Sequence, residues 1–266
     1  MIENERITVL GAGLSATFAV AAFYEHGYRN FLIVTDRVFP QFYGILIEHV
    51  PKMVERYLTP YPLEISFLGE ESYEKYYLKR FKRIPQKFSR FTFRETQIYH
   101  PIHLQSLIMS LVKPKIIFTK IKFEDIEFYT QTSKYVIQTF PNPDQEREKF
   151  VFRAWTRIEP WKPDGKVYIL HNTTDDSWYR EIGNLGFKLR EFVAEYEPTT
   201  EQLATEQWIK LKFLQPDIPS IDLQDSRQKN LLLVGRWARW NPNLFAETAY
   251  FEIKKFLEEE KTHEDR

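Results

Sequence analysis

Gly11, Gly13 and Ala16 form a G-x-G-x-x-A pattern directly after an apolar stretch that begins at Ile7. A glycine at the first position permits a tight turn, and a glycine at the second lets the backbone approach a pyrophosphate group. A small residue at the third position lets a helix pack closely on a sheet. Residues of these types at this spacing are typical of a site that binds the phosphates of a dinucleotide.

The turn leads into a predicted helix whose first residues are Leu14 and Ser15. A helix N-terminus offers free N–H groups and a partial positive charge, which suit the phosphates of a nucleotide. Asp36 follows the third position of the pattern by twenty residues, with Arg37 beside it. There the carboxylate is placed to accept hydrogen bonds from a ribose diol.

The alternative interpretation is a glycine turn in an ordinary β-α-β unit, with Asp36 at a solvated strand end. The chain contains nine glycines in all, and two of them stand at this spacing. Because glycine is scarce in this chain, two glycines at this spacing favour the nucleotide site over an ordinary turn.

The composition excludes several other kinds of chemistry. The 266 residues include no cysteine, which excludes disulfides, thiolate catalysis, cysteine-ligated zinc or iron–sulfur clusters and a cysteinyl-linked flavin. The 37 basic and 37 acidic side chains cancel, so no net charge draws the chain to nucleic acid or to an anionic membrane. The amino terminus shows no secretory signal, and the apolar runs fall far short of the roughly 20 residues of a membrane span. We therefore expect a soluble, cytoplasmic protein without a metal centre.

The elements around the glycine turn are expected to form a β-α-β unit. A strand over 7–10 precedes a helix over 14–26, which Gly27 closes because glycine accepts the left-handed conformation at a helix C-terminus. A second strand covers 31–35, so the unit begins a parallel sheet. Further on, 116–140 alternates like the strands of an antiparallel meander, and more strands are expected at 150–155, 166–170 and 187–196.

The carboxyl end returns to a buried strand, a glycine turn and a helix, in "NLLLVGRWARWNPNLFAETAYFEI" (230–253). Apolar residues of the last helix recur at three-to-four spacing and share one face: Ala246, Ala249, Tyr250, Ile253, Phe256 and Leu257. We therefore expect the two chain ends to fold into one sheet around an inserted middle.

This last segment resembles the closing FAD segment of the glutathione-reductase-like flavoprotein superfamily, above all its amine oxidase, protoporphyrinogen oxidase and UDP-galactopyranose mutase branch. The resemblance implies that Gly235 and Arg236 lie near the FAD pyrophosphate, and that Asn243 and Leu244 lie near the flavin ring. A helix N-terminus at that place would stabilise negative charge on a reduced flavin.

A second segment, "YHPIHLQSL" (99–107), is similar to one that leads from the substrate side back to the FAD domain in the mutases and their relatives. The strand after it, "IIFTKIKF" (116–123), is where that superfamily pairs its backbone with adenine. By this resemblance Ile121 or Lys122 would contact the adenine.

The resemblance implies an α/β fold with a Rossmann-like FAD-binding domain built from both chain ends and an inserted α+β substrate domain with an antiparallel sheet. The first domain would comprise 1–60, 100–132 and 226–266, and the second 61–99 and 133–225. FAD would bind non-covalently.

The chain departs from the family in lacking the Arg-Gly-Gly after the second strand and the A-T-G near a sheet strand. It has no second glycine fingerprint for an NAD(P)H domain, although NAD(P)H could visit the flavin as a reductant.

Other residues have both a chemical and a structural interpretation. The basic and aromatic stretch 75–93 could grip phosphates and stack bases of a nucleic acid or a nucleotide-linked substrate, or be a solvated helix face over an aromatic core. His100 and His103 could be acid–base groups or hold a flavin, or be structural. Without carboxylate or cysteine companions they are a poor metal site.

Tyr179 and Arg180 could bind an anionic group on a substrate-facing sheet, or end a strand with a buried aromatic. Trp237 and Trp240 flank Arg239 beside the expected flavin, where they could shield the ring or pack the helix.

Three hypotheses for function follow. The first is an FAD-dependent oxidoreductase or mutase-like flavoenzyme, which takes a hydride from a small substrate or uses reduced FAD as a nucleophile on a nucleotide-linked one. The second is a catalytically silent FAD- or nucleotide-binding subunit that docks a protein or nucleic acid. The third is an NAD(P)-binding reductase. The sequence leaves the substrate and the oligomeric state open.

Overall fold

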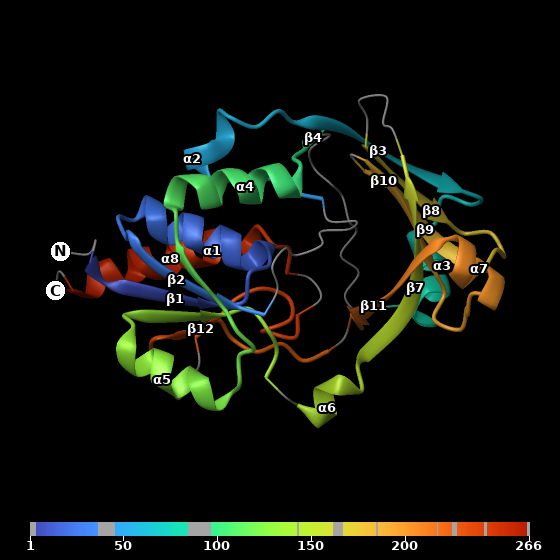
Figure 1. Cartoon of the computed structure of the whole chain (residues 1–266). Coiled ribbons are helices and arrows are strands. Elements are labelled where there is room, and N and C mark those ends of the chain that lie inside the picture. Colours follow the sequence, from blue (N-terminus) through green and yellow to red (C-terminus); the bar gives the residue numbers. More distant parts are fainter. Residues whose placement is uncertain are drawn as a thin grey trace.

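The computed structural model describes residues 4–36, 46–84, 97–142, 144–161, 167–184, 186–216, 218–224, 228–241 and 244–264. Their strands form two sheets, in two parts of the molecule that lie side by side (Figure 1). One sheet has five strands in the order β12-β6-β1-β2-β5, and the other has seven in the order β11-β7-β10-β9-β8-β3-β4. The expected fold class is confirmed: a Rossmann-like α/β part uses both chain ends, and a second sheet is inserted between them.

The strands of the first sheet run parallel to their neighbours. They are β1 (Arg6–Leu10), β2 (Asn30–Thr35), β5 (Lys115–Phe118), β6 (Tyr135–Gln138) and β12 (Leu231–Leu233). The carboxyl ends of parallel strands meet at one edge of a sheet. Gly11, Asp36, Thr139 and Val234 each follow a strand, so all four lie along that edge.

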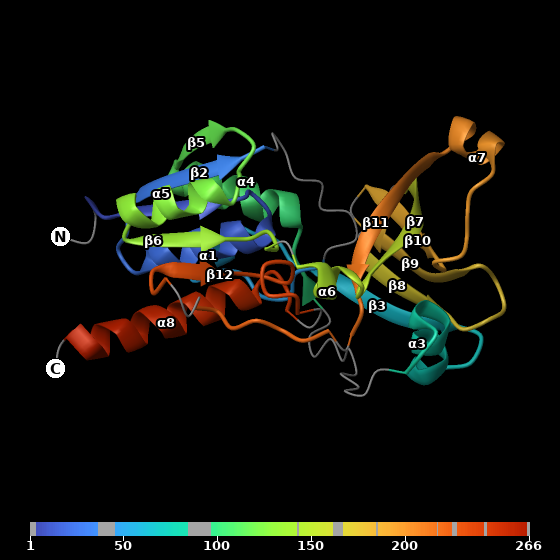
Figure 2. The ribbon, with the colours of Figure 1, turned by 90° about the horizontal axis from the view of Figure 1, so that it is seen from below.

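Helices cover both faces of the parallel sheet (Figures 1 and 2). On one face lie α1 (Leu14–Glu25), α4 (Pro101–Val112) and α8 (Thr248–Glu264), with the short α2 (Lys52–Glu55) against α4. On the other face lies α5 (Glu124–Thr132), whose Ile126 packs on Leu10 and Val136. None of the described helices is both long and apolar enough to cross a membrane.

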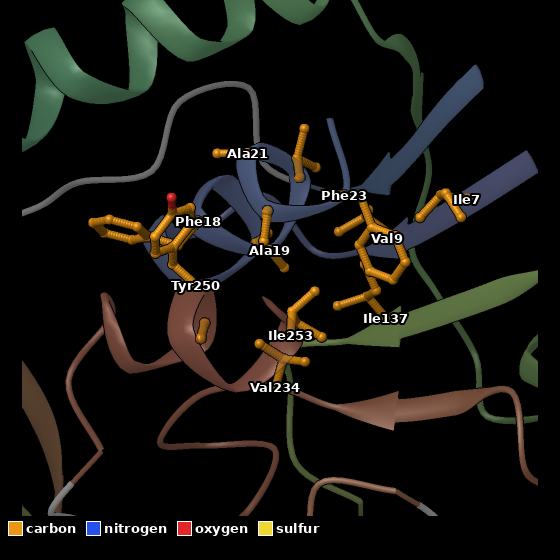
Figure 3. Close-up of a cluster of buried hydrophobic side chains, with 14 of the residues drawn as sticks. Ile7, Val9, Phe18, Ala19, Ala21, Phe23, Ile137, Val234, Tyr250 and Ile253 are labelled. Carbon is orange, nitrogen blue, oxygen red and sulfur yellow. The ribbon is translucent and has the colours of Figure 1, made fainter. Parts of the chain in front are cut away.

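Helix α1 is the centre of the larger core. Nine of its twelve residues are buried, because the sheet, α4 and α8 surround it. Figure 3 shows Phe18 and Phe23 of α1 among side chains of the sheet and of α8, including Val9, Ile137 and Ile253. The helix that carries the glycine turn is therefore held firmly by its whole surface.

The second sheet is mostly antiparallel, with β3 and β8 paired in parallel. Its strands are β3 (Tyr61–Leu68), β4 (Gln97–Ile98), β7 (Val151–Pro160), β8 (Val167–Asn172), β9 (Trp178–Asn184), β10 (Phe187–Phe192) and β11 (Gln207–Leu214). The helices of this part are α3 (Tyr73–Phe81), α6 (Gln145–Glu148) and α7 (Thr200–Thr205). Ser72 caps α3 by accepting from the N–H of Lys75.

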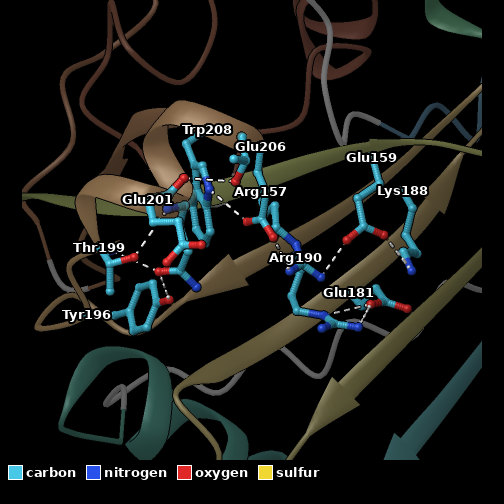
Figure 4. A network of polar contacts seen from close by, with 12 residues as sticks. Arg157, Glu159, Glu181, Lys188, Arg190, Tyr196, Thr199, Glu201, Glu206 and Trp208 are labelled. Atoms are coloured by element: carbon cyan, nitrogen blue, oxygen red, sulfur yellow. Dashed lines mark hydrogen bonds and ion pairs between the residues drawn. The ribbon is translucent and has the colours of Figure 1, made fainter.

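A network of charged side chains covers one face of this sheet (Figure 4). Arg190 on β10 stands opposite Glu181 on β9 and Arg157 on β7, and its guanidinium donates to the Glu181 carboxylate at 2.8 and 2.5 Å. Arg157 pairs with Glu159 and Glu206. Cross-strand pairs of opposite charge stabilise this register.

Two expectations are wrong. The stretch 116–140 is not a meander: it forms β5, α5 and β6, and both strands belong to the parallel sheet. Four-residue strands are too short for their alternation to distinguish them from other elements, and the acidic first turn, with Glu124 and Asp125, favours a helix there. The strand β6 consequently lies in the nucleotide part, although the expected domain boundary stood at residue 132.

Candidate functional site

The glycine turn after β1 requires its first glycine. Gly11 has φ of +103°, and a Cβ built on it would lie 2.2 Å from Thr139 Oγ1. Its N–H donates to the Val34 carbonyl at 2.8 Å, and Thr139 Oγ1 donates to the Leu10 carbonyl at 2.9 Å. Both the backbone conformation and the close neighbour exclude a side chain. The tight turn predicted from the sequence is present.

Gly13 is the residue before the first turn of α1, and the space beside it is open. No described atom lies within 4 Å of a Cβ built on Gly13, and no described side chain caps this helix. Gln105 of α4 braces the turn from behind by donating to the Ala12 carbonyl at 3.0 Å and to Thr17 Oγ1 at 3.2 Å. The helix N-terminus is thus rigid and accessible, as an anion site requires.

The other residues of the pattern have distinct environments. Ala16 is fully buried between helix and sheet, and the Leu14 side chain is in the core, so only the backbone of Leu14 is left to face a ligand. Ser15 is partly exposed. Asp36 is exposed directly after β2, at the same sheet edge as the glycine turn. Arg37 lies outside the described residues.

The turn after β12 meets the first turn of α1. Gly235 has φ of +88°, and a Cβ built on it would lie 2.3 Å from Ser15 Oγ and 2.7 Å from Ser15 Cβ. The Val234 N–H donates to the Gln138 carbonyl at 2.9 Å, which holds the preceding strand end on β6. The structure therefore brings Gly235 together with the Gly11–Ala16 turn, more than two hundred residues away in the chain.

Arg236 extends from this turn toward the second sheet. Its Nε donates to the Leu244 carbonyl at 3.3 Å. Burial, together with the charges of Arg80 and Arg180 in the second part, lowers the pKa of Arg236 to about 10, against the opposing effect of Glu191. Arg236 therefore lies between the two parts of the molecule. Asn243 is outside the described residues.

The residues expected near adenine lie in a loop. The strand β5 ends at Phe118, earlier than the expected strand 116–123. Ile121 is partly buried against the cluster that contains Leu10 and Val34, and the Lys122 N–H donates to Asp125 Oδ2 at 3.0 Å. The N–H of Lys122 is thus engaged at the start of α5, which leaves Ile121 as the candidate for an adenine contact.

His100 and His103 both have structural roles at the start of α4. His100 Nδ1 accepts from the N–H groups of Ile102 and His103 at 3.2 and 3.4 Å, and so caps α4. The His100 and His103 rings stack with centroids 4.3 Å apart. The helix α4 begins at Pro101, directly after His100.

Tyr179 and Arg180 lie on β9 of the second sheet. Tyr179 is fully buried beneath Tyr76 of α3, and the Arg180 guanidinium donates to both carboxylate oxygens of Glu191 at 2.6 and 2.8 Å. Burial alone would raise the pKa of Glu191, but Arg180 and then Arg80 hold it below its ordinary value. The pair is therefore ionised.

The outer side of the described part of the basic and aromatic stretch, through Ile84, is a solvated helix face, whereas Arg80 points to the aromatic side chains beneath α3. Tyr76 and Tyr77 are buried on the inner side of α3, whereas Lys75 and Lys82 form ion pairs with Glu70 and Glu195 at the surface. Trp240 is buried and Trp237 is partly buried, and both pack against the ends of β7 and β11. They fill the junction between the two parts.

Sequence reasoning missed Glu247, a buried carboxyl group just before α8. Burial raises the pKa of Glu247 to about 8, with a contribution from Glu48, and the backbone N–H groups of Glu48 and His49 oppose the rise. The signal in the sequence was an acidic residue between Ala246 and Ala249 on the apolar face of the helix.

Neither a protein-family model nor a curated protein matches the chain. Solved structures do resemble it. The lathipeptide tryptophan 5-halogenase MibH has a TM-score of 0.59 at 8% sequence identity, over 94% of this chain and 66% of MibH. BrvH, a flavin-dependent halogenase from Brevundimonas sp. BAL3, has a TM-score of 0.53 at 11% identity, over 97% of this chain and 72% of BrvH. CtdE, solved in complex with FAD and a substrate, has a TM-score of 0.52 at 9% identity, over 94% of this chain and 79% of CtdE.

At these identities the likeness concerns the fold. The chain has the two-part architecture of these proteins and is shorter than each of them. The likeness therefore bears on the fold alone, and the two structures whose activity is named are of halogenases rather than of amine oxidases or mutases.

Proposed function

We propose that this chain is an FAD-dependent flavoenzyme. The contact between Gly235 and Ser15 carries the proposal, because it places two glycine turns from opposite ends of the chain at one open helix N-terminus. A dinucleotide pyrophosphate needs such a surface of backbone N–H groups without intervening side chains. The flavin named for BrvH and the FAD present in CtdE support this choice of dinucleotide.

The residues around the edge of the parallel sheet fit this cofactor. The turn from Gly11 to Ala16 would face the pyrophosphate, and exposed Asp36 would accept from the ribose hydroxyl groups. Gly235 would line the opposite side, with Leu244 toward the ring. FAD, when bound, supplies an acceptor or donor of hydride that the described side chains do not provide.

The reaction we propose first is either oxidation of a small substrate by hydride transfer to FAD, of the amine oxidase type, or a redox-neutral, mutase-like rearrangement of a nucleotide-linked substrate with reduced FAD as the nucleophile. A second candidate is halogenation with NAD(P)H as the source of electrons, which the halogenases MibH and BrvH favour. Anaerobic reduction of the bound flavin by an amine would support the oxidase reaction, and isomerisation of a nucleotide sugar only when the flavin is reduced would support the mutase-like reaction. Product formation that requires reduced flavin, dioxygen and a halide would support the second.

The cofactor itself is tested on the purified protein. We expect flavin absorbance bands and release of intact FAD on denaturation. A colourless protein that binds NADPH and does not take up added FAD would overturn the proposal. Flavin that no substrate or reductant reduces would instead indicate a silent FAD-binding subunit.

A further inference from the structure

A row of polar side chains crosses the second sheet on the face opposite the network of Figure 4. The strand registers place Thr156 of β7 opposite Glu191 of β10, Glu191 opposite Arg180 of β9, and Arg180 opposite His171 of β8. Residues directly opposite one another in a sheet point to the same face. Thr156, Glu191 and His171 are buried, so this polar row lies inside the molecule.

Only some of the polar atoms in this row have hydrogen-bond partners among the described residues. Arg180 uses both oxygens of Glu191. Among the described residues, Thr156 Oγ1 and His171 Nδ1 are buried without a hydrogen-bond partner, and so is Arg80 Nε of α3. Unsatisfied polar atoms are costly inside a protein, and three of them gather beside one ion pair. Such a cluster is typical of a place that a polar ligand completes.

Arg80 lies at this row. Its guanidinium is 5.1 Å from the centroid of the Tyr179 ring and 5.5 Å from that of Phe213, and its Nη1 donates to Tyr76 Oη at 3.2 Å. The Tyr76 ring in turn contacts His171, with centroids 4.4 Å apart. Arg80 is therefore held by aromatic rings and one hydroxyl, and no described carboxylate contacts its guanidinium.

Arg236 approaches the same place from the nucleotide part. Its neighbours Trp237 and Trp240 pack against Leu214, the last residue of β11. Leu214 adjoins Phe213, whose ring lies near Arg80. Arg80 and Arg180 are also close enough to Arg236 for their charges to lower its pKa, so the arginine after the Gly235 turn lies near the arginine of α3.

The charges of this cluster do not balance among the described residues. Arg80, Arg180 and Arg236 are positive, whereas Glu191 is the one described carboxylate among them and its two oxygens are occupied by Arg180. Burial, Arg180 and Arg80 lower the pKa of His171 to about 3, so its ring is neutral at pH 7. Two positive charges are thus left, on Arg80 and Arg236. Buried charges without partners are unfavourable, and a dianion would neutralise them.

We propose that a phosphate group of the substrate binds between Arg80 and Arg236, against the row formed by Thr156, Glu191, Arg180 and His171. Arginine matches phosphate because its planar fork donates two parallel hydrogen bonds. The proposal names a substrate class for the flavoenzyme proposed above and rests on that function. FAD carries phosphates too, but Arg80 belongs to the inserted sheet part, away from the open N-terminus of α1 that suits the pyrophosphate.

The test titrates inorganic phosphate into the FAD-loaded protein by calorimetry, with three variants. Arg80→Gln and Arg236→Gln should each weaken phosphate binding tenfold or more, whereas Arg29→Gln, an exposed arginine just before β2 at the opposite sheet edge, should leave it unchanged. The Arg236→Gln variant removes a buried charge, so it should fold at least as stably as the wild type. Equal phosphate affinity in all four proteins would overturn the proposal.

Two further results distinguish a site for substrate phosphate from a site for the phosphates of FAD. They also distinguish failure of the phosphate site from failure of the flavoenzyme proposal. If FAD loading abolishes phosphate binding and Arg80→Gln weakens FAD binding by the same factor, the cluster serves the cofactor and the substrate proposal is wrong. If the chain takes up no FAD, the flavoenzyme proposal fails, but the same titration on the colourless protein still decides the cluster. Arg80-dependent phosphate binding then upholds the phosphate site, and its absence refutes it.

Discussion

A Cβ built on Gly235 would lie 2.3 Å from Ser15 Oγ, so the turn that closes the parallel sheet and the first turn of α1 fit against each other with no room for a methyl group. Both turns follow strands of the same sheet, and neither could move without displacing the other. The geometry of the candidate cofactor site therefore depends on this one contact between the two ends of the chain.

Gly235→Ala should destabilise the protein more than Gly27→Ala does. Both glycines have positive φ, +88° and +97°, which costs an alanine about 1–2 kcal/mol. No described atom lies within 4 Å of a Cβ built on Gly27, whereas Gly235 adds the clash with Ser15. Urea unfolding measures the two costs. A second substitution, Ser15→Gly, should recover part of the loss in Gly235→Ala and none in Gly27→Ala; equal costs for the two alanine variants would contradict the contact.

Gly13→Asp should abolish FAD binding without unfolding the protein. Gly13 has φ of −75° and ψ of 177°, which any residue adopts, and the space beside it is open. An aspartate there would cap α1, which adds only about a few tenths of a kcal/mol relative to glycine, while its carboxylate repels the pyrophosphate. Flavin content and the melting temperature are measured together. Gln131→Glu on exposed α5 adds the same charge as a control and should retain the flavin.

Local spacing was sufficient to predict the glycine turn, because Gly11 and Gly13 act on the residues next to them in the chain. The closing turn at Gly235 was predicted from the sequence pattern and its place near a cofactor by resemblance, whereas its contact with Ser15 depends on the folded sheet. The row through Thr156, Glu191, Arg180 and His171 could not be predicted. It depends on the register of four strands, which the local sequence does not specify, and the pairing of β9 with β10 shifts just beyond it, between Glu191 and Phe192.

Glu247→Gln should change how stability depends on pH above neutrality. The folded protein holds the pKa of Glu247 at about 8, chiefly by burial, against an ordinary value of 4.5. The folded state therefore keeps a proton that the unfolded chain releases, so this group's contribution is complete below pH 4.5 and is lost as the pH rises to 8. Glutamine mimics the protonated carboxyl group and has no proton to release as the pH rises. Relative to wild type, the variant should gain stability, on the order of a few kcal/mol, between pH 5 and pH 9.

Urea unfolding of both proteins at several pH values provides the measurement. A difference between variant and wild type that does not change from pH 5 to pH 9 would show that Glu247 ionises normally in the folded protein.

His171→Gln should reduce the loss of stability in acid. Burial, together with Arg180 and Arg80, lowers the pKa of His171 to about 3 from an ordinary value of 6.5. The unfolded chain therefore takes up a proton first, and the folded state loses stability as the pH falls from 6.5 toward 3. This loss is on the order of 3 kcal/mol between pH 7 and pH 4, and glutamine, which stays neutral, would not incur it. As the pH falls from 7 to 4, the wild type should therefore lose more stability than the variant, which urea unfolding measures. Phosphate should raise the pKa of His171 in the wild type, and its ring resonances report this in a titration by nuclear magnetic resonance. Parallel stability curves for the two proteins from pH 7 to pH 4 would contradict the placement of His171 beside the uncompensated arginines.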